Sequence, residues 1–459
     1  MDDNEKKLKK LGVSIPRILM PREGADMHKW SVVACDQYTS EPEYWRSVEE
    51  YVGSSPSTLK LIFPEVYLED SDYEERIRSI GETMQEYIDR GILIEYEPSF
   101  FLVKRTPPDS PERWGLMAAL DLEKYDYSKD SQTPIRATEG TIEERIPPRK
   151  KIREKAPIEL PHILVLIDDE KKSLIEPLKN KALKENSFEK IYDFDLMKNG
   201  GHVTGYKIDR AEDIKQVASA LEGLANPDMF EKKHGNRDVL LFAMGDGNHS
   251  FATAKAVWED IKRSAPENFM NHPARWALVE IENIYDDGLI FEPIHRVVFG
   301  GTFEDFRTLL EQKCDAVFRE KNTLKEVNEV VLSGGKNGNS LKNPGEENIQ
   351  YIGFLDSTRK GVFKVTDSDS TIAAGTAQSI IDELLKIKTG VTVDYIHGEE
   401  TAESLGSRDG NFALILPPLD KHDFFRTVIN DGALPRKTFS MGEAHEKRYY
   451  LEGRKIQGD

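Results

Sequence analysis

The chain has 459 residues, enough for two or three domains of common size, and its 63 Lys and Arg residues against 82 Asp and Glu residues give a formal charge of −19. This charge repels polyanions, so we expect no general binding of nucleic acid. The two cysteines, Cys35 and Cys314, fit neither a disulfide framework nor a zinc ribbon. No apolar run suits a membrane span or a signal peptide. These observations predict a cytoplasmic protein without membrane association.

The first half of the chain alternates apolar runs with amphipathic segments, a pattern typical of an α/β fold. The charged, proline-interrupted stretch 140–161 predicts either an exposed connection or a loop that faces a ligand. The other predicted elements are strands at 30–36, 100–105, 162–169 and 239–244, and helices at 41–52, 73–91 and 211–225.

The second half continues the alternation. Residues 276–298 predict two strands joined by a turn at Asp286, Asp287 and Gly288. Residues 302–389 predict a helix, two strands and another helix around the loop 333–348, which is the one flexible-looking segment. We therefore predict a main α/β core over 14–300, a smaller α/β subdomain over 301–390, and a C-terminal segment over 391–459 that returns to the functional site.

The hexapeptide "GDGNHS", Gly245–Ser250, stands between a predicted strand and an amphipathic helix. The first amides of such a helix have no partner within it and carry the positive end of its dipole, and the two glycines let a ligand approach the backbone. The turn therefore predicts an anion site, unless Asp246 or Asn248 simply caps the helix. His249 favours the anion site, because it can donate to a phosphate or carry a proton and capping does not require it.

The tail "LPRKTFSMGEAHEKRYY" concentrates positive charge in an acidic protein. It holds Arg436, Lys437, Lys447 and Arg448 within a short span. Such a cluster indicates an anionic ligand. The alternative is a solvated charged segment with ordinary surface ion pairs.

Further polar residues stand near predicted strands. Asp36 stands at the end of the predicted strand 30–36, where ligands collect in α/β sheets. It can hold a metal ion, act as a base or only form a turn. Cys35 is expected to be a small buried residue rather than a nucleophile. Glu139, His295 and Arg296 are weaker candidates, because Arg and Glu usually lie at surfaces.

Several stretches taken together resemble a known family. They are "KWSVVACDQYTSEPEYW", "MGDGNHSFATAKA", "GLIFEPIHR", "VDYIHG" and "LPRKTFSMGEAHEKRYYLEGR". Along nearly the whole chain they resemble the bacterial and archaeal family called domain of unknown function 1015. The central motif of that family, a D-G-H-H-R-like sequence, resembles the phosphate-binding turn of the ParB N-terminal domain, sulfiredoxin and an archaeal free serine kinase. Here the motif runs from Asp246 through Gly247 to Ser250, with Asn248 in place of the first histidine, His249 retained, and Ser250 in place of the arginine.

The resemblance implies an α/β fold with a mixed sheet, in which a ParB- and sulfiredoxin-like core carries an inserted smaller α/β subdomain. It also implies a site for a nucleotide or another phosphorylated small molecule. The sequence itself contains no P-loop, no dinucleotide-binding glycine motif and no G-x-S-x-G nucleophile elbow. We therefore expect a small-molecule phosphotransferase that uses Mg²⁺ with ATP or ADP and acts on an anionic small-molecule ligand. The alternatives are a non-catalytic, nucleotide-dependent switch or adaptor, and a structural protein without a ligand.

In the phosphotransferase hypothesis, each candidate residue has a role. The amides from Gly245 to Ser250 bind phosphates, and His249 contacts the transferred group. The other phosphate-binding candidates neutralise charge; they are Arg436, Lys437, Arg448, His295 and Arg296. A base or magnesium ligand is expected among Asp36, Asp246 and Glu139.

Overall fold

The structure is a computed structural model that describes residues 2–128, 131–140, 146–185, 187–264, 269–337, 348–435 and 437–457. Of the predicted flexible loop 333–348, residues 338–347 lie outside the described residues. The chain forms two compact units. The first comprises Met1–Ala137, Thr141–Leu289 and Glu443–Asp459, and the second comprises Thr138–Gly140 and Ile290–Gly442.

The first unit is built on a mixed sheet with the strand order β10-β11-β4-β5-β13-β9-β12-β7-β6, and β1 adds a further pairing to β5. Its strands are β1 (Val13–Ser14), β2 (Leu19–Pro21), β3 (Leu93–Glu95), β4 (Phe100–Thr106), β5 (Arg113–Asp121), β6 (Tyr125–Asp126), β7 (Ile135–Arg136), β8 (Ile158–Glu159), β9 (Leu164–Ile167), β10 (Glu189–Asp195), β11 (His202–Ile208), β12 (Phe242–Asp246), β13 (Trp276–Asn283) and β21 (Arg454–Lys455). Its helices are α1 (Asp3–Leu11), α2 (Met27–Trp30), α3 (Pro42–Val52), α4 (Tyr73–Asp89), α5 (Ile146–Arg153), α6 (Ile175–Asn180), α7 (Ala211–Leu224), α8 (Pro227–His234) and α9 (Asn248–Ser264).

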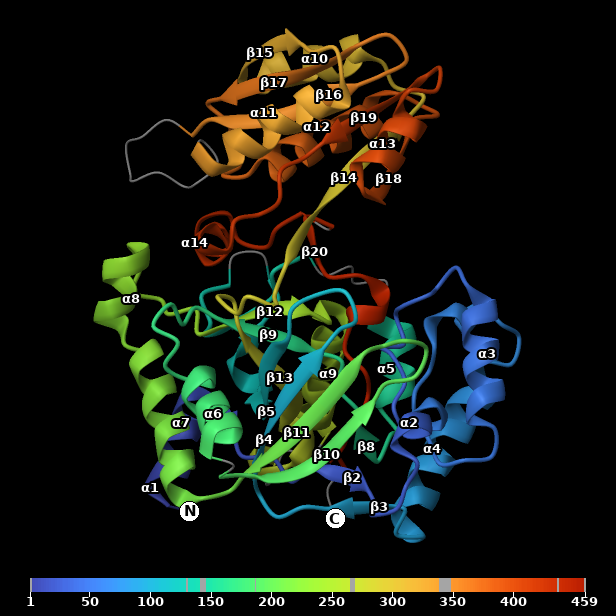
Figure 1. The fold of residues 1–459 in the computed structure, drawn as a ribbon, viewed down its shortest axis with the longest axis vertical. Helices are drawn as coiled ribbons and strands as arrows, with labels where there is room; N and C mark the ends of the chain where they lie inside the picture. Colours follow the sequence, from blue (N-terminus) through green and yellow to red (C-terminus); the bar gives the residue numbers. More distant parts are fainter. Residues whose placement is uncertain are drawn as a thin grey trace. The chain divides into compact units, whose positions relative to one another are not determined.

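Both faces of this sheet are buried. Successive residues of a strand point to opposite faces, and every residue of β5 is buried. Leu116 and Ala118 pack into the core shared with α1, α6, α7 and α9, whereas Met117 packs into the core shared with α2, α3 and α4. Figure 1 shows α1, α6 and α7 gathered on one side of this unit and α2, α3 and α4 on the other. This arrangement explains why the central strands are almost continuously apolar.

The second unit holds its own sheet, with the order β15-β17-β16-β19-β14-β18 and with β20 paired to β14. Its strands are β14 (Phe291–Phe299), β15 (Asp315–Glu320), β16 (Gln350–Leu355), β17 (Lys360–Thr366), β18 (Thr392–His397), β19 (Asn411–Ile415) and β20 (Phe439–Met441). Its helices are α10 (Phe303–Lys313), α11 (Leu324–Asn337), α12 (Ala373–Ile387), α13 (Glu399–Gly406) and α14 (Lys421–Asp431). The prediction of a mixed α/β protein is confirmed.

Two local predictions were wrong. Residues 31–36 form no regular strand; this apolar segment instead contacts the C-terminal segment through the isolated bridge between Val33 and Tyr449. Residues 146–153 form the helix α5 rather than a loop, because Pro147 and Pro148 fall in its first turn, where a proline costs no helical hydrogen bond. The two strands predicted within 276–298 are confirmed as β13 and β14, and these strands belong to different sheets.

The units also divide the chain differently from the predicted domains. The second unit begins at Ile290 instead of residue 301 and continues to Gly442. Most of the predicted C-terminal segment 391–459 therefore belongs to the second unit, and the part from Glu443 onward belongs to the first. Among the described helices, none is long and apolar enough to cross a membrane.

Candidate functional site

The "GDGNHS" turn joins β12 to α9 in the first unit. The register between β12 and β9 shifts between Met244 and Asp246, so Gly245 sits at a bulge. Gly247 has φ +79°, and a Cβ placed on it would lie 3.1 Å from the Cα atom of Ile163. The shape of the turn therefore requires a glycine at position 247, and α9 begins directly after it at Asn248.

Asp246 stands at the start of α9. One carboxylate oxygen accepts a 2.8 Å hydrogen bond from the amide of Gly247, and the other lies 3.3 Å from Nζ of Lys447. Burial raises the pKa of Asp246, but the positive charge of Lys447 and the nearby His162 outweigh it, so its pKa is lower than usual. Asp246 is thus ionised, and its hydrogen bond to the amide of Gly247 supports the turn just before α9.

His162 lies beside the same turn because β9 and β12 are antiparallel. In that pairing Asp246 is opposite Leu164, so the residues just before β9 meet the end of β12. The ring of His162 is buried, with Nε2 3.0 Å from Oγ of Ser250 and Nδ1 2.8 Å from the hydroxyl of Tyr450. His162 therefore connects the first turn of α9 to the C-terminal segment.

Asp36 lies near His162 because its segment is hydrogen-bonded to the C-terminal segment. The amide of Ala34 donates to the carbonyl of Arg448, and the amide of Tyr450 donates to the carbonyl of Val32. These bonds hold residues 32–36 beside 448–450. One Asp36 oxygen accepts a 2.9 Å bond from the amide group of Gln37, and the other lies 3.8 Å from Nε2 of His162.

The imidazole of His162 thus lies near two of the predicted catalytic residues of the first unit, Asp36 and Asp246. His249 lies half-buried in the first turn of α9, where its carbonyl accepts a 2.7 Å hydrogen bond from Thr253. Sequence reasoning missed His162 and Tyr450. The one available signal was that His162 stands next to a buried strand. This signal places His162 at the site only when the antiparallel pairing of that strand with β12 is known.

Arg448 does not fit its predicted role. It is 4% exposed, its Nε donates to the carbonyl of Pro161, and its two other guanidinium nitrogens donate to Glu280 and Glu452. Burial lowers the pKa of Arg448, but these two carboxylates raise it by more, so the charge is permanent. Arg448 is therefore an internal ion-pair partner, because its donors are used inside the first unit.

Other predicted residues belong to the second unit. Glu139 accepts a 3.2 Å hydrogen bond from the amide of Lys437. The buried guanidinium of Arg296 donates to Gln378 and to the carbonyl of Ile294, which argues against its predicted contact with phosphate. Arg436 lies outside the described residues.

His295 is also buried in the second unit. Its Nδ1 accepts from the amide of Leu416, and among the described residues its Nε2 has no hydrogen-bond partner. Burial, followed by the charge of Arg296 and the proximity of His397, lowers the pKa of His295 to about 4. His295 is therefore neutral near pH 7 and adds no positive charge for a phosphate.

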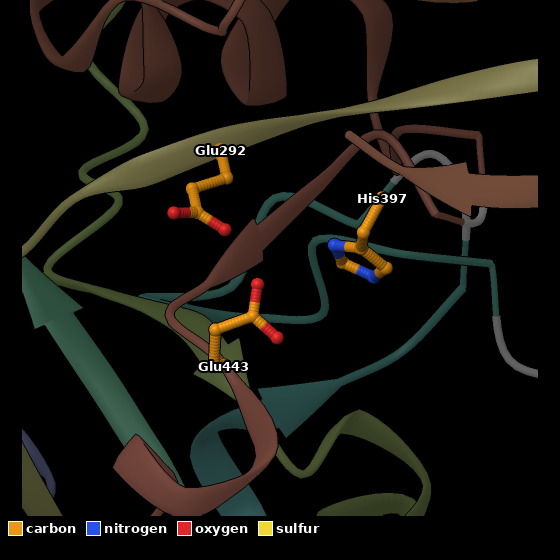
Figure 2. Close-up of side chains that lie close together, drawn as sticks. All are labelled: Glu292, His397 and Glu443. Atoms are coloured by element: carbon orange, nitrogen blue, oxygen red, sulfur yellow. The ribbon is translucent and has the colours of Figure 1, made fainter. Parts of the chain in front are cut away.

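Figure 2 shows Glu292 of β14 and His397 at the end of β18 close together in the second unit. Their possible ligand atoms lie within 4.8 Å of each other. Because β14 and β18 are paired, with Ile294 opposite His397, this closeness follows from the register. The third residue labelled in the figure, Glu443, belongs to the first unit. Two side chains alone do not define a metal site.

The fold and the site define a mixed α/β protein of two units, with a strand-to-helix turn whose helix N-terminus is flanked by carboxylates, a lysine and a histidine. The chain belongs to the family described as "Protein of unknown function (DUF1015)", which it matches over residues 19–372. The resemblance found in the sequence is thereby confirmed. No curated protein matches the chain.

The chain is distantly similar to several solved structures. A conserved hypothetical protein from Pyrococcus furiosus is 9% identical with a TM-score of 0.34, and the match covers 74% of this chain and 95% of that one. A free serine kinase variant in complex with ADP is 10% identical with a TM-score of 0.37, over 74% and 92%. A C-terminally truncated SbnI from Staphylococcus aureus is 10% identical with a TM-score of 0.33, over 74% and 85%. Similarity at this level does not establish a shared activity.

Proposed function

We propose that the first unit binds the phosphates of a nucleotide at the turn between β12 and α9 and transfers a phosphoryl group to a small molecule. The observation that carries this proposal is the arrangement around the turn. Lys447 supplies a positive charge at Asp246, while His162 connects Ser250 with Asp36. Phosphoryl transfer depends mainly on positioning and on neutralising charge, and the site offers groups for both.

The phosphate groups would lie at the N-terminus of α9. This helix has 17 residues, and its first turn presents backbone amides and the positive end of the helix dipole. The ammonium group of Lys447 lies on the same side, since it contacts Asp246 directly before the helix. We assign to Lys447 the charge-neutralising role that the sequence suggested for Arg448.

The carboxylates fit a magnesium ion that enters with the nucleotide. Mg²⁺ is usually held by one or two carboxylates together with substrate phosphates rather than by an all-protein cage. Among the residues that the structure describes, neither Asp36 nor Asp246 belongs to a cluster of three possible ligand side chains. Asp246 or Asp36 would therefore hold the ion jointly with the phosphates, and the ion would neutralise charge on the transferred group.

The transfer step uses groups that this chain supplies. The hydroxyl oxygen of the acceptor forms a bond to the γ-phosphorus of a nucleoside triphosphate. The bond from that phosphorus to the β,γ-bridging oxygen breaks, and its electron pair leaves with the nucleoside diphosphate. Asp36 accepts the proton of the acceptor hydroxyl, and the side-chain amide of Gln37 donates to the other oxygen of Asp36 and orients it. His249 contacts the transferred group from the first turn of α9.

Titration calorimetry with ATP, ADP, CTP, GTP and pyrophosphate, each with and without Mg²⁺, tests the binding. We expect at least one nucleotide to bind, and His249→Ala to weaken that binding while the denaturation midpoint stays near that of the unaltered protein. His422→Ala, in the second unit, is the matched control and should leave nucleotide affinity unchanged.

Each result has a distinct meaning. Binding of none of these compounds contradicts the proposal. Tight binding without phosphoryl transfer to any acceptor supports the alternative of a nucleotide-dependent switch or adaptor.

A further inference from the structure

A cavity of about 140 Å³ lies within the first unit, next to the "GDGNHS" turn. It is lined by Ser250 and Thr253 from the first turns of α9, by α5, and by the segment that leads into β9. A cavity of about 150 Å³ with aliphatic and aromatic walls holds a benzene molecule. The cavity therefore has room for a ligand body about the size of a benzene ring.

Most of the cavity wall is apolar. The side chains on this part of the wall include Leu61, Phe63, Leu68, Met84, Ile152 and Leu278. The charged lining residues are paired with each other, Glu65 with Arg149 and Glu159 with Arg153. Among the described lining residues, each charged group has an oppositely charged partner, so a charged ligand would find no unpaired counter-charge there. Burying an unpaired charge costs far more free energy than burying a hydroxyl group.

The polar groups gather at one end, where His162, Ser250, Tyr450 and Cys35 line the cavity. The hydroxyl oxygen of Tyr450 accepts from the amide of Cys35, so its own proton is available for Nδ1 of His162. Burial raises the pKa of Tyr450, which keeps this proton in place.

Because Nδ1 of His162 accepts from Tyr450, the ring proton of His162 is on Nε2, where it donates to Oγ of Ser250. This leaves the Ser250 hydroxyl with its own proton to donate to a ligand atom. Burial also raises the pKa of the Cys35 thiol, so this end of the cavity carries hydroxyl and thiol groups without a negative charge on sulfur.

We propose that this cavity binds the phosphoryl acceptor, and that the acceptor is a small molecule with an uncharged, mainly apolar body and one hydroxyl group. The apolar body occupies the space between α5 and the segment 61–68. The hydroxyl group lies at the polar end, against Ser250 and His162. This inference rests on the proposed function, because it names the acceptor class for the same site.

The placement is consistent with the transfer step. An acceptor hydroxyl at Ser250 is in the first turn of α9, whose N-terminus is the proposed phosphate site. Asp36 lies on the Nε2 side of His162 and is therefore on the same side as that hydroxyl. An acceptor with an ammonium or carboxylate group would have to place that charge against the apolar wall, so free amino acids are excluded.

Calorimetric titration of the full chain with benzyl alcohol, ethylbenzene and L-serine, without nucleotide, tests the proposal. Benzyl alcohol and ethylbenzene have the same size and differ in one hydroxyl group. We expect both to bind and L-serine to give no binding. We expect Ser250→Ala to weaken benzyl alcohol binding by roughly two- to tenfold, the size of one neutral hydrogen bond, and to leave ethylbenzene binding unchanged.

Variants with a filled cavity provide a second test of the binding site. Ile152→Phe enlarges a half-buried side chain of α5 that lines the cavity, and it should abolish binding of both aromatic compounds. Ile214→Phe changes a half-buried isoleucine of α7 outside the cavity lining and should not affect binding. If Ile152→Phe does not fold, Leu68→Phe makes the same test from another wall.

The outcomes separate this inference from the proposed function. Binding of L-serine, or equal loss of both aromatic compounds in Ser250→Ala, overturns the assigned acceptor class. A protein that binds ATP but neither aromatic compound loses only the cavity assignment. A protein that binds benzyl alcohol but no nucleotide loses the proposed function, and with it the acceptor role of the cavity.

Discussion

Arg448 and Lys447 are neighbours in the sequence, yet the structure predicts opposite effects when each is replaced by methionine. The side chain of Arg448 is 3% exposed and holds the buried carboxylates of Glu280 and Glu452. The side chain of Lys447 is 12% exposed and contacts Asp246, which is 26% exposed. Arg448→Met should therefore reduce stability, and Lys447→Met should reduce nucleotide binding.

The magnitudes follow from burial. Removing one partner of a buried ion pair leaves an uncompensated charge and costs about 3–5 kcal/mol. Arg448→Met leaves two such carboxylates, so we expect a loss of at least that size and a Tm lower by roughly 5–10 °C, at about 2 °C per kcal/mol for a unit of this length. Lys447→Met breaks a partly exposed pair, which contributes at most about 1 kcal/mol to stability. Losing its charge-assisted hydrogen bond to phosphate costs about 1.5–3 kcal/mol, or roughly a tenfold to hundredfold loss of affinity.

Scanning calorimetry measures the Tm of each variant, and titration calorimetry with ATP and Mg²⁺ measures its ATP affinity. Binding is measured at a temperature where each variant remains folded. We expect Arg448→Met to bind ATP with nearly unchanged affinity. The reasoning is refuted if Arg448→Met keeps its Tm and loses ATP binding, because Arg448 would then be a ligand-binding residue. It is also refuted if Lys447→Met binds ATP as the unaltered protein does.

Three further predictions follow from the same geometry. Gly247→Ala should destabilise the protein by about 1–2 kcal/mol and weaken ATP binding, because the backbone at φ +79° disfavours a side chain and the added Cβ would crowd Ile163. The control is Gly24→Ala, at φ +85° with open space around it. This variant should show the backbone cost alone and leave ATP affinity unchanged in titration. Burial raises the pKa of Glu282 from its ordinary value of 4.5 to about 8, against the opposing effect of Arg113, so the folded state keeps a proton that the unfolded state loses. The free energy of unfolding should fall as pH rises from about 4.5 to about 8, and Glu282→Gln should flatten this part of the curve in denaturant titrations; an unchanged slope would contradict the assignment. Asp36→Asn should keep ATP binding and lose transfer by roughly a hundredfold in an assay of ADP formation with benzyl alcohol, and a variant with normal transfer would remove Asp36 as the base.

The local part of the site could be predicted from the sequence. A strand, a glycine-containing turn and an amphipathic helix are contiguous, so the pattern of residues around Gly245 and Gly247 was sufficient to place the turn between β12 and α9. The helix α5 is not evident from the sequence, because prolines in a charged stretch favour a loop, whereas here they stand in the first turn of a helix.

The long-range part could not be predicted in this way. His162 meets Ser250 only because β9 and β12 run antiparallel, and no local pattern encodes which strands pair. Arg448 and Lys447 look alike as charges in the sequence, but Arg448 enters the core while Lys447 stays at the turn. Burial of a charged residue depends on partners far away in the chain, here Glu280.

A crystal structure of the protein with ADP and Mg²⁺ tests the central claim most directly. We predict that the β-phosphate oxygens lie within hydrogen-bond distance of the backbone amides between Gly247 and Ser250 and of the Nζ atom of Lys447. ADP bound at another place in the protein, with this turn free of phosphate at saturating ADP, would contradict the proposed site.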